Sequence, residues 1–232
     1  MDYQLQYFQE NPDMHLRDSI SKVKQIRQVI PQDIEARSLL DIACGAGLIT
    51  TELVKILKPK YAEGIDISSR MIKKAKSLDT TRLVRWKKAD ILKHRIRKKF
   101  DIVFCIDILE HIKDDLLFLR RVSQLGRYIV IRTPLEDAFF SRFLRRAGIY
   151  DSWKDTENRY GHVHHYNEKV LSKKLKESGF VILKEDSAPM PRRSNFILEI
   201  FRLLFYPISI FSMNAMVRIS GGFKIYLLEK KR

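Results

Sequence analysis

The chain has 232 residues, which is long enough for one large domain with a substantial buried core. Its apolar fraction of 45% is that of a globular protein and excludes a disordered, polar chain. A formal net charge of +16 favours anionic surroundings, such as nucleic acid, acidic phospholipid or a negatively charged substrate, without choosing among them.

The N-terminal part of the chain predicts a helix before any strand. Residues 1–10 are polar and aromatic and lack the apolar centre of a signal peptide, so we expect a cytoplasmic protein. From Met14 to Ile30 apolar residues recur at helical spacing, and Pro31 ends the pattern. This helix either packs on a sheet and does nothing more, or it also flanks a ligand site.

Two glycines stand between the first predicted strand and the next helix. The apolar run Leu39 to Ile42 suits a strand buried on both faces, and an amphipathic run from Leu48 to Leu57 follows the glycines. Gly45 and Gly47 let the backbone turn sharply and leave no side chain between it and a ligand. The N-terminus of the helix directs free N–H groups at the same place, so this order of elements favours a nucleotide-type site.

Three aspartates stand at the ends of three successive predicted strands. Asp41 precedes the glycines, Asp66 ends a strand over residues 61–67, and Asp90 ends a strand over residues 83–89. Helical segments separate the strands, so the sheet should be parallel, and ligands of such sheets bind at the carboxyl ends of the strands. A carboxylate at Asp66 is suited to accept both hydroxyls of a ribose.

The remaining elements continue the alternation of strand and helix. The predicted strands are Phe100–Ile106, Tyr128–Ile131, Phe180–Leu183 and Phe223–Leu228, and the predicted helices are Arg70–Ser77, Asp114–Val122, Ala138–Ala147 and Asn167–Ser178. Cys44 and Cys105 lie in apolar, strand-like contexts and are interpreted as small buried side chains rather than a disulfide.

Three motifs carry a resemblance to a known family. Residues 41–47 read DIACGAG, residues 100–111 read FDIVFCIDILEH, and residues 161–180 have the arrangement GHxxxYxxxxLxxxLxxxGF. The chain thereby resembles the class I S-adenosylmethionine-dependent methyltransferases of the small-molecule type, and in particular the ubiquinone-pathway O-methyltransferases. The match covers about residues 35–135, 161–185 and 222–230.

The resemblance implies one α/β domain over residues 1–232, with a doubly wound, seven-stranded, Rossmann-like methyltransferase sheet and helices on both faces. A helical flank over residues 1–34 and inserted helical segments over 135–166 and 187–221 would complete it. S-adenosylmethionine is the implied cofactor. The residues expected to bind it are Asp41, Ala43, Gly45, Gly47, Asp66, Ile67, Asp90, Ile91 and Ile106.

The catalytic groups expected from the resemblance are histidines. Methyl transfer to a hydroxyl needs a group that removes its proton, and His111 by position, or His162, His164 or His165 from the insert, would do so. The alternative for His111 is a structural role that ties a helix to a loop. Asp107, Glu110 and His111 also resemble a metal-ligand set of some ubiquinone-type enzymes and of small-RNA 2′-O-methyltransferases, with aspartate in place of the first glutamate. A divalent ion held there, with His162 as a further candidate ligand, would lower the pKa of a hydroxyl.

The inserts carry the information on substrate. Residues 196–211 are dense in large apolar side chains, but Glu199, Arg202 and Pro207 interrupt them, so we expect no transmembrane segment. The run is either an extra helix of the core or a dimer contact, or an amphipathic cover that admits a lipid-like substrate. In the second case Arg192, Arg193 and Arg202 would favour peripheral contact with an anionic membrane.

The expected function is methyl transfer from S-adenosylmethionine to a small or lipid-linked acceptor, at a hydroxyl oxygen. An alternative is an RNA methyltransferase, because Arg82 to Lys99 contains nine basic residues and one aspartate. No RNA-binding appendage is recognisable, which places nucleic acid second. A non-catalytic subunit that binds the cofactor and serves a partner is the third hypothesis.

Overall fold

A computed structural model describes residues 16–190, 200 and 203–231 of the protein. A seven-stranded sheet with strand order β3-β2-β1-β4-β5-β7-β6 forms its centre. The strands are β1 (Ser38–Ile42), β2 (Tyr61–Asp66), β3 (Val84–Lys88), β4 (Phe100–Ile106), β5 (Gly126–Leu135), β6 (Phe180–Pro189) and β7 (Gly222–Lys230). The first five strands are parallel, and β7 is antiparallel to both of its neighbours. This confirms the predicted doubly wound sheet.

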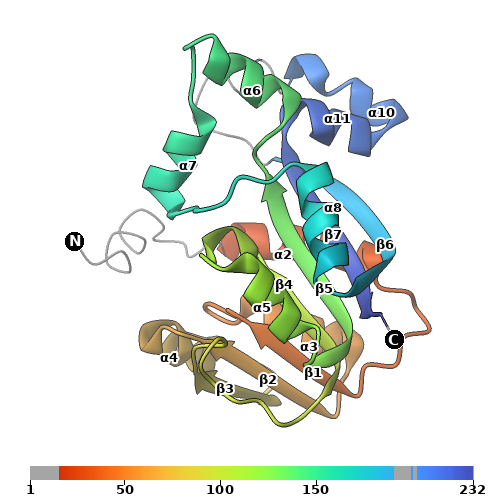
Figure 1. Ribbon diagram of the computed structural model, residues 1–232. Helices are drawn as coiled ribbons and strands as arrows, with labels where there is room; N and C mark the ends of the chain where they lie inside the picture. Colours follow the sequence, from red (N-terminus) through yellow and green to blue (C-terminus); the bar gives the residue numbers. More distant parts are fainter. Residues whose placement is uncertain (1–15, 191–199, 201–202, 232) are drawn as a thin grey trace.

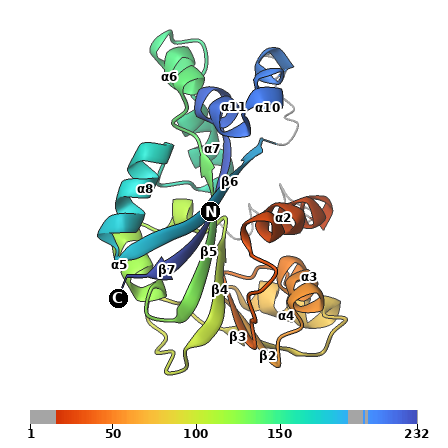
Figure 2. The same ribbon diagram turned by 90° about the vertical axis from the view of Figure 1, so that its right-hand side faces the viewer.

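Helices cover both faces of the sheet, as Figures 1 and 2 show. Helices α2, α3 and α4 lie on one face, and α5 and α8 lie on the other. Their bounds are α2 (Leu16–Val29), α3 (Leu48–Leu57), α4 (Ser69–Leu78), α5 (Asp115–Val122) and α8 (Glu168–Glu177). Each face of the sheet therefore has its own apolar core, and strands β1 and β4 contribute to both.

Local sequence sets the N-terminal ends of α4 and α8. Ser68 caps α4 by accepting a hydrogen bond from the Met71 N–H at 3.4 Å, and Asn167 caps α8 by accepting one from the Val170 N–H at 2.9 Å. Cys44 and Cys105 are free and buried, which confirms their interpretation as small core residues.

The inserted segments form a separate helical layer above the sheet, which we call the cap. It consists of α6 (Phe139–Arg146) and α7 (Ser152–Tyr160) from the first insert, and residues 203–221 from the second, which include α10 (Ile208–Phe211) and α11 (Met213–Ser220). Helices α6 and α11 are in contact, so the two inserts meet although they are far apart in the chain. Arg192, Arg193 and Arg202 lie outside the described residues.

Three features of the inserts differ from expectation. Strand β5 continues to Leu135 and β6 to Pro189, so Ser187 to Pro189, expected in the insert, pair with β7 instead. Helix α7 was not expected, because its sequence is polar on every side and shows no apolar periodicity. Its signals are at the ends: Asp151 accepts hydrogen bonds from two N–H groups of the first turn, and Gly161 ends the helix with φ +69°.

Among the described residues, every helix is too short or too polar to cross a bilayer.

Candidate functional site

The two glycines of the turn after β1 have different structural roles. Gly45 has φ +54°, and no atom lies within 4 Å of the position that a Cβ would take. Gly47 has φ +77°, and a Cβ there would lie 2.5 Å from the indole ring of Trp86. Gly45 therefore keeps its surroundings open to a ligand, whereas Gly47 makes room for a side chain from β3. The sequence predicted the first role for both residues.

Asp66 connects the end of β2 to this turn. Its carboxylate accepts one hydrogen bond from the Gly45 N–H at 3.0 Å and another from the Ser68 N–H at 2.8 Å. Burial raises the pKa of Asp66, and these two backbone bonds act in the opposite direction. Each carboxylate oxygen retains a free lone-pair direction, so Asp66 can hold the glycine turn and still accept from a ligand.

Asp41 lies deeper, in β1 directly before the turn. It is buried, and its carboxylate accepts a hydrogen bond from the hydroxyl of Thr50 in α3. Burial, together with the neighbouring Asp66, raises the pKa of Asp41 to about 7 in spite of that bond. Asp41 therefore fixes α3 against β1 and has no surface open to a ligand's hydroxyl groups.

The other predicted cofactor residues lie around the same rim of the sheet. Asp90 ends the segment after β3 and accepts a hydrogen bond from the Leu92 N–H at 2.9 Å. Ile91 and Ile106 are buried, while Ile67 is exposed. Ala43 has φ +58°, a strained value for a residue with a side chain, in the middle of the turn. Strained backbone of this kind often marks a functional turn.

Asp107 does not join the group in which the sequence placed it. It follows β4 with φ +52°, and its carboxylate pairs with Arg132 of β5 and with Lys22 of α2, at 2.8 Å from Lys22 Nζ. Burial would raise its pKa, but the two cations outweigh burial and lower it. Asp107 therefore anchors α2 to the rim of the sheet, because both of its oxygens are engaged by these cations.

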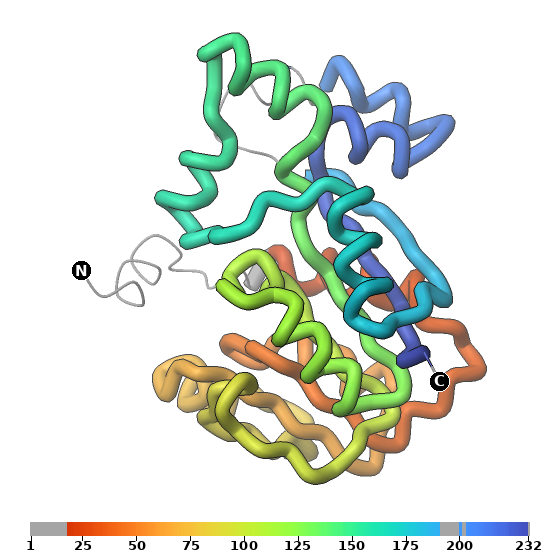
Figure 3. The backbone as a smooth tube through the Cα atoms, viewed as in Figure 1, coloured from red at the N-terminus to blue at the C-terminus, as the bar shows by residue number. Residues whose placement is uncertain are grey.

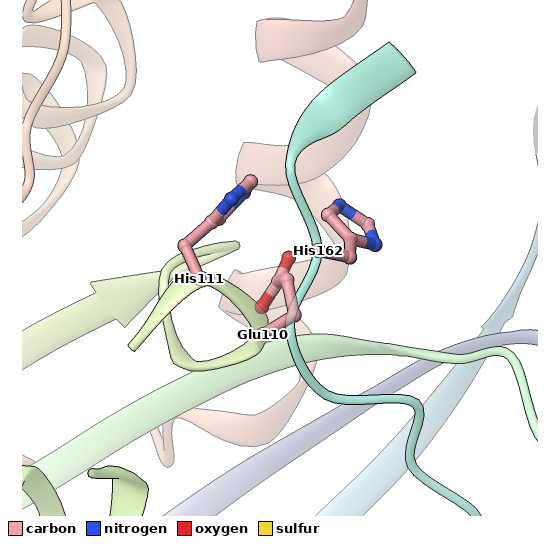
Figure 4. Close-up of side chains that lie close together, drawn as sticks. All are labelled: Glu110, His111 and His162. Carbon is pink, nitrogen blue, oxygen red and sulfur yellow. The ribbon is translucent and has the colours of Figure 1, made fainter. Parts of the chain in front are cut away.

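Glu110, His111 and His162 form a compact group instead (Figure 4). One nitrogen or oxygen atom from each lies within 4.8 Å of the others. Glu110 and His111 belong to a short 3-10 helix, η1 (Leu109–His111), that follows β4. His162 comes from the segment between α7 and α8, which passes over η1 (Figure 3). Backbone bonds hold that segment in place, since Val163 N–H and His164 N–H both donate to the carbonyl oxygen of Glu110.

Glu136, which sequence reasoning missed, orients His162. Its carboxylate is buried and lies 2.8 Å from Nδ1 of His162 and 2.7 Å from Nδ1 of His165. The hydroxyl of Thr156 in α7 adds a third hydrogen bond at 3.1 Å. Glu136 follows directly after β5, so an acidic residue at the end of a fifth strand was the available signal.

The charges of these groups follow from their surroundings. Burial opposes ionisation of Glu136, but hydrogen bonds from His162 and His165 outweigh it and lower its pKa to about 2. Burial likewise opposes protonation of His162, but Glu136 and the nearby carboxylates raise its pKa. Burial, together with His162, lowers the pKa of His111 to about 4, so His111 is neutral near pH 7. Burial and Asp107 raise the pKa of Glu110 to about 7.

Glu136 also fixes the tautomer of His162. An ionised carboxylate only accepts hydrogen bonds, so Nδ1 of His162 carries a proton and donates it to Glu136. Nε2 of His162 is then the nitrogen that takes up a proton when the ring becomes charged. The arrangement is that of a histidine base with a carboxylate behind it.

The predicted metal set is only partly brought together. Glu110 and His111 lie in one group with His162, but Asp107 is held away by Arg132 and Lys22. A carboxylate and two imidazoles suit several divalent transition metals, and Glu136 would orient His162 in that role too. The set that the structure offers is therefore Glu110, His111 and His162.

Comparison with known proteins gives the family. A family model described as a methyltransferase domain matches residues 14–185. The ubiquinone biosynthesis O-methyltransferase of Pelagibacter ubique is 29% identical over 125 residues, which are 52% of this chain and 47% of that protein. The chain thus spans about half the length of the curated relatives it matches.

Solved structures agree on the fold. A putative methyltransferase in complex with the Trm112 methyltransferase activator of Haloferax volcanii superimposes with a TM-score of 0.69 at 12% identity, covering 96% of this chain and 94% of that one. The N-methyltransferase NodS of Bradyrhizobium japonicum, solved with S-adenosyl-l-homocysteine, superimposes with a TM-score of 0.64 at 14% identity, covering 99% and 98%. With its glycine turn, its Asp66 and its doubly wound sheet, the chain belongs to the class I S-adenosylmethionine-dependent methyltransferases.

Proposed function

We propose that the protein methylates a hydroxyl oxygen of a small or lipid-linked acceptor, with His162 as the base. The observation that carries the proposal is the bond between Glu136 and His162 beside Glu110 and His111. Nitrogen acceptors that are already nucleophilic need no base, whereas a hydroxyl must lose its proton as the new bond forms. A buried carboxylate that orients a histidine favours the hydroxyl.

In this proposal S-adenosylmethionine binds at the glycine turn after β1 and along the adjoining rim of the sheet. S-adenosylmethionine supplies the electrophilic methyl group when bound. Gly45 leaves its surroundings open, Asp66 offers carboxylate lone pairs, and Asp90 and Ile91 lie at the end of the neighbouring strand segment. The residues present thus fit the group, since they combine an acid for ribose hydroxyls with a turn that leaves a ligand room.

His162 would take the acceptor's proton at Nε2, while its Nδ1–H keeps donating to Glu136. The carboxylate stabilises the resulting imidazolium without becoming protonated, since its own pKa is about 2. The ring of His111 lies 4.8 Å from that of His162, edge to face, and its low pKa keeps it neutral as a hydrogen-bond partner of the acceptor. Such positioned acid–base groups typically contribute about 10²- to 10⁴-fold in rate.

Labelled cofactor and fractionated cell extract test the proposal. Label transferred from S-adenosylmethionine should enter a lipid or small-molecule fraction, and the bond formed should resist hydroxylamine and mild base, as an ether does. The His162→Gln variant should bind the cofactor like the wild type and transfer label at least 100-fold more slowly. Label on nitrogen, or unchanged transfer by the variant, would overturn the assignment of acceptor and base.

RNA methylation is a second candidate, supported by the exposed basic surface of β3 and the loop after it. Arg85, Lys87 and Lys88 are exposed on this edge strand, and Lys98 lies over the ring of Tyr61 at 3.4 Å. Arg121 holds the loop in place through the carbonyl oxygens of Ile91 and His94. Steeply salt-dependent RNA binding and label in the RNA fraction would favour this candidate.

A further inference from the structure

The cap exposes large apolar side chains at a density that folding does not explain. They come from both inserts, from α6 and the turn after it and from residues 203–211. We call them the apolar cap surface: Phe139, Phe143, Ile149, Leu203, Leu204, Tyr206, Ile210 and Phe211. Ile210 is 77% exposed and Phe211 is 91% exposed. Clustered exposure of this kind marks an interaction site, whereas single exposed apolar residues are common on any protein.

The two inserts present this surface on the same end of the molecule. Figures 1 and 2 both place α6, α10 and α11 together, above the sheet. The ring of Phe140 meets that of Phe205 edge to face at 5.4 Å, and α6 contacts α11. Phe139 and Phe143 lie one helical turn apart and are both exposed, so α6 turns one apolar stripe outward.

The two segments that carry the apolar cap surface contain basic but no acidic side chains. Residues 139–149 contain three arginines, Arg142, Arg145 and Arg146, and no acidic residue, while residues 203–217 contain no charged residue at all. Arg146 is exposed and follows Phe139 and Phe143 on the same face of α6. The nearest acids belong to neighbouring segments: Asp137 lies 3.8 Å from Arg142, and α7 carries charges of both signs. Arg146 remains exposed beside the apolar side chains, and such a face suits an anionic lipid bilayer, whose headgroups attract arginine while its acyl region accepts aromatic and aliphatic side chains.

We propose that the apolar cap surface docks on an anionic membrane and lies in its interface. The exposed side chains enter the boundary between headgroups and acyl chains, and Arg146 contacts lipid phosphates. A second copy of this chain as occupant is disfavoured, because neither apolar segment, residues 139–149 or 203–211, has an acidic side chain that could pair with the arginines of the other copy's α6.

The docked cap would stand in direct contact with the candidate catalytic group. Arg145 lies over the ring of Trp153 at 3.4 Å, and Trp153 stacks on His165 with ring centroids 4.7 Å apart. His165 and His162 then share the carboxylate of Glu136. A membrane-bound cap therefore brings the bilayer close to the histidine proposed as base, where a lipid-linked acceptor would be available. The docking itself does not depend on which atom is methylated.

Vesicle flotation tests the docking without any assay of methyl transfer. The full chain should float with vesicles of phosphatidylcholine and phosphatidylglycerol in equal parts, and should remain unbound with phosphatidylcholine alone. The double variant Ile210→Ser, Phe211→Ser should weaken binding at least tenfold, because the isoleucine and phenylalanine side chains move from water into the membrane interface on docking. Arg146→Glu should weaken it about tenfold and reduce its dependence on salt concentration.

Matched controls are available far from the cap. Leu83→Ser removes an exposed apolar side chain next to β3, and Lys76→Glu reverses a charge on α4, at the opposite end of the molecule. Both should float like the wild type. Failure of the wild type to float with anionic vesicles, or equal loss from the cap variants and the controls, would overturn the proposal. If the wild type instead forms dimers and does not bind vesicles, and the cap substitutions dissociate those dimers, the surface is the contact with a second copy of the chain.

Discussion

The carboxylate of Glu136 lies 2.8 Å from Nδ1 of His162, although the two residues come from opposite ends of the first insert. Glu136 follows directly after β5, and His162 follows α7. The intervening cap helices close the loop that brings the pair together. The acid that orients the candidate base therefore belongs to the sheet scaffold, while the base itself is delivered by the insert.

Replacement of Glu136 tests this pair directly. Glu136→Gln keeps the size and one acceptor atom but removes the negative charge, so a charged His162 loses its stabilisation. We expect methyl transfer to fall about 10- to 100-fold, with cofactor affinity within twofold of the wild type by calorimetry. Glu157→Gln, an exposed neighbour on α7, is the matched control and should be fully active. Full activity of Glu136→Gln would remove the carboxylate from the mechanism.

Asp66 should determine cofactor affinity. Its carboxylate holds the N–H groups of Gly45 and Ser68, so its removal loosens the turn and withdraws the acceptor for ribose hydroxyls together. Asp66→Ala should weaken S-adenosylmethionine binding tenfold or more, about 1.4 kcal/mol or above, in calorimetry. Glu63→Ala removes an acid from the same strand without contact to the turn and serves as control. Unchanged affinity of the Asp66 variant would contradict the assignment.

The two glycines should respond differently to alanine. At Gly47 a Cβ would lie 2.5 Å from Trp86, so Gly47→Ala should lower the free energy of unfolding by about 2–3 kcal/mol, measured in urea. At Gly45 a Cβ would enter open space, so Gly45→Ala should lower the free energy of unfolding only by the strain of an alanine at positive φ, about 1 kcal/mol. Gly45→Ala should instead weaken cofactor binding more than its loss of stability implies. Equal stability losses in the two variants would contradict these separate roles.

The parts of the fold that local patterns determine could be predicted. Helix α3 and strand β4 have the predicted bounds, because apolar runs bordered by glycine, proline and charged residues carry their own start and stop signals. The aspartates at the strand ends follow from the same reasoning, since a parallel sheet collects its strand ends at one rim.

Contacts between distant segments could not be predicted from spacing. Asp107 looked like the first member of a metal-ligand set beside Glu110 and His111, but Lys22 and Arg132 reach it from α2 and β5. Gly47 was assigned to a ligand, but Trp86, from β3, occupies the space beside it. Glu136 could have been found as an acidic residue at the carboxyl end of a strand. It was missed because β5 was expected to end before Pro134, whereas the strand continues to Leu135.

The stability of the protein should fall as pH rises through the titration of Asp41. The folded pKa of Asp41 is about 7, above the unfolded value of 3.8, because burial disfavours its charged form. The folded state therefore holds this proton more tightly than the unfolded state. The resulting contribution of Asp41 to the free energy of unfolding is fully present below pH 3.8 and is lost as the pH rises to about 7. The loss is on the order of 4 kcal/mol.

Asp41→Asn should abolish this part of the pH dependence. The amide still accepts the hydrogen bond from Thr50 and carries no charge at any pH. In urea denaturation at several pH values from 4 to 8, the difference in stability between variant and wild type should shift in favour of the variant as pH rises. A parallel pH dependence in the two proteins would show that Asp41 ionises normally in the folded state.

Removal of divalent metal ions should leave methyl transfer unchanged, because in the proposed route His162 accepts the proton and Glu136 balances the charge. The measurement is the transfer rate after exhaustive dialysis against a chelator, repeated with added magnesium, manganese or zinc. Glu110→Gln provides the matched variant, since it removes a carboxylate of the candidate metal group and keeps the bond from Thr133. The opposite result would be that the wild type loses activity on chelation and regains it with one metal, while Glu110→Gln does not respond to metal. That result would assign Glu110, His111 and His162 to a metal ion. The bound metal, rather than His162, would then activate the hydroxyl.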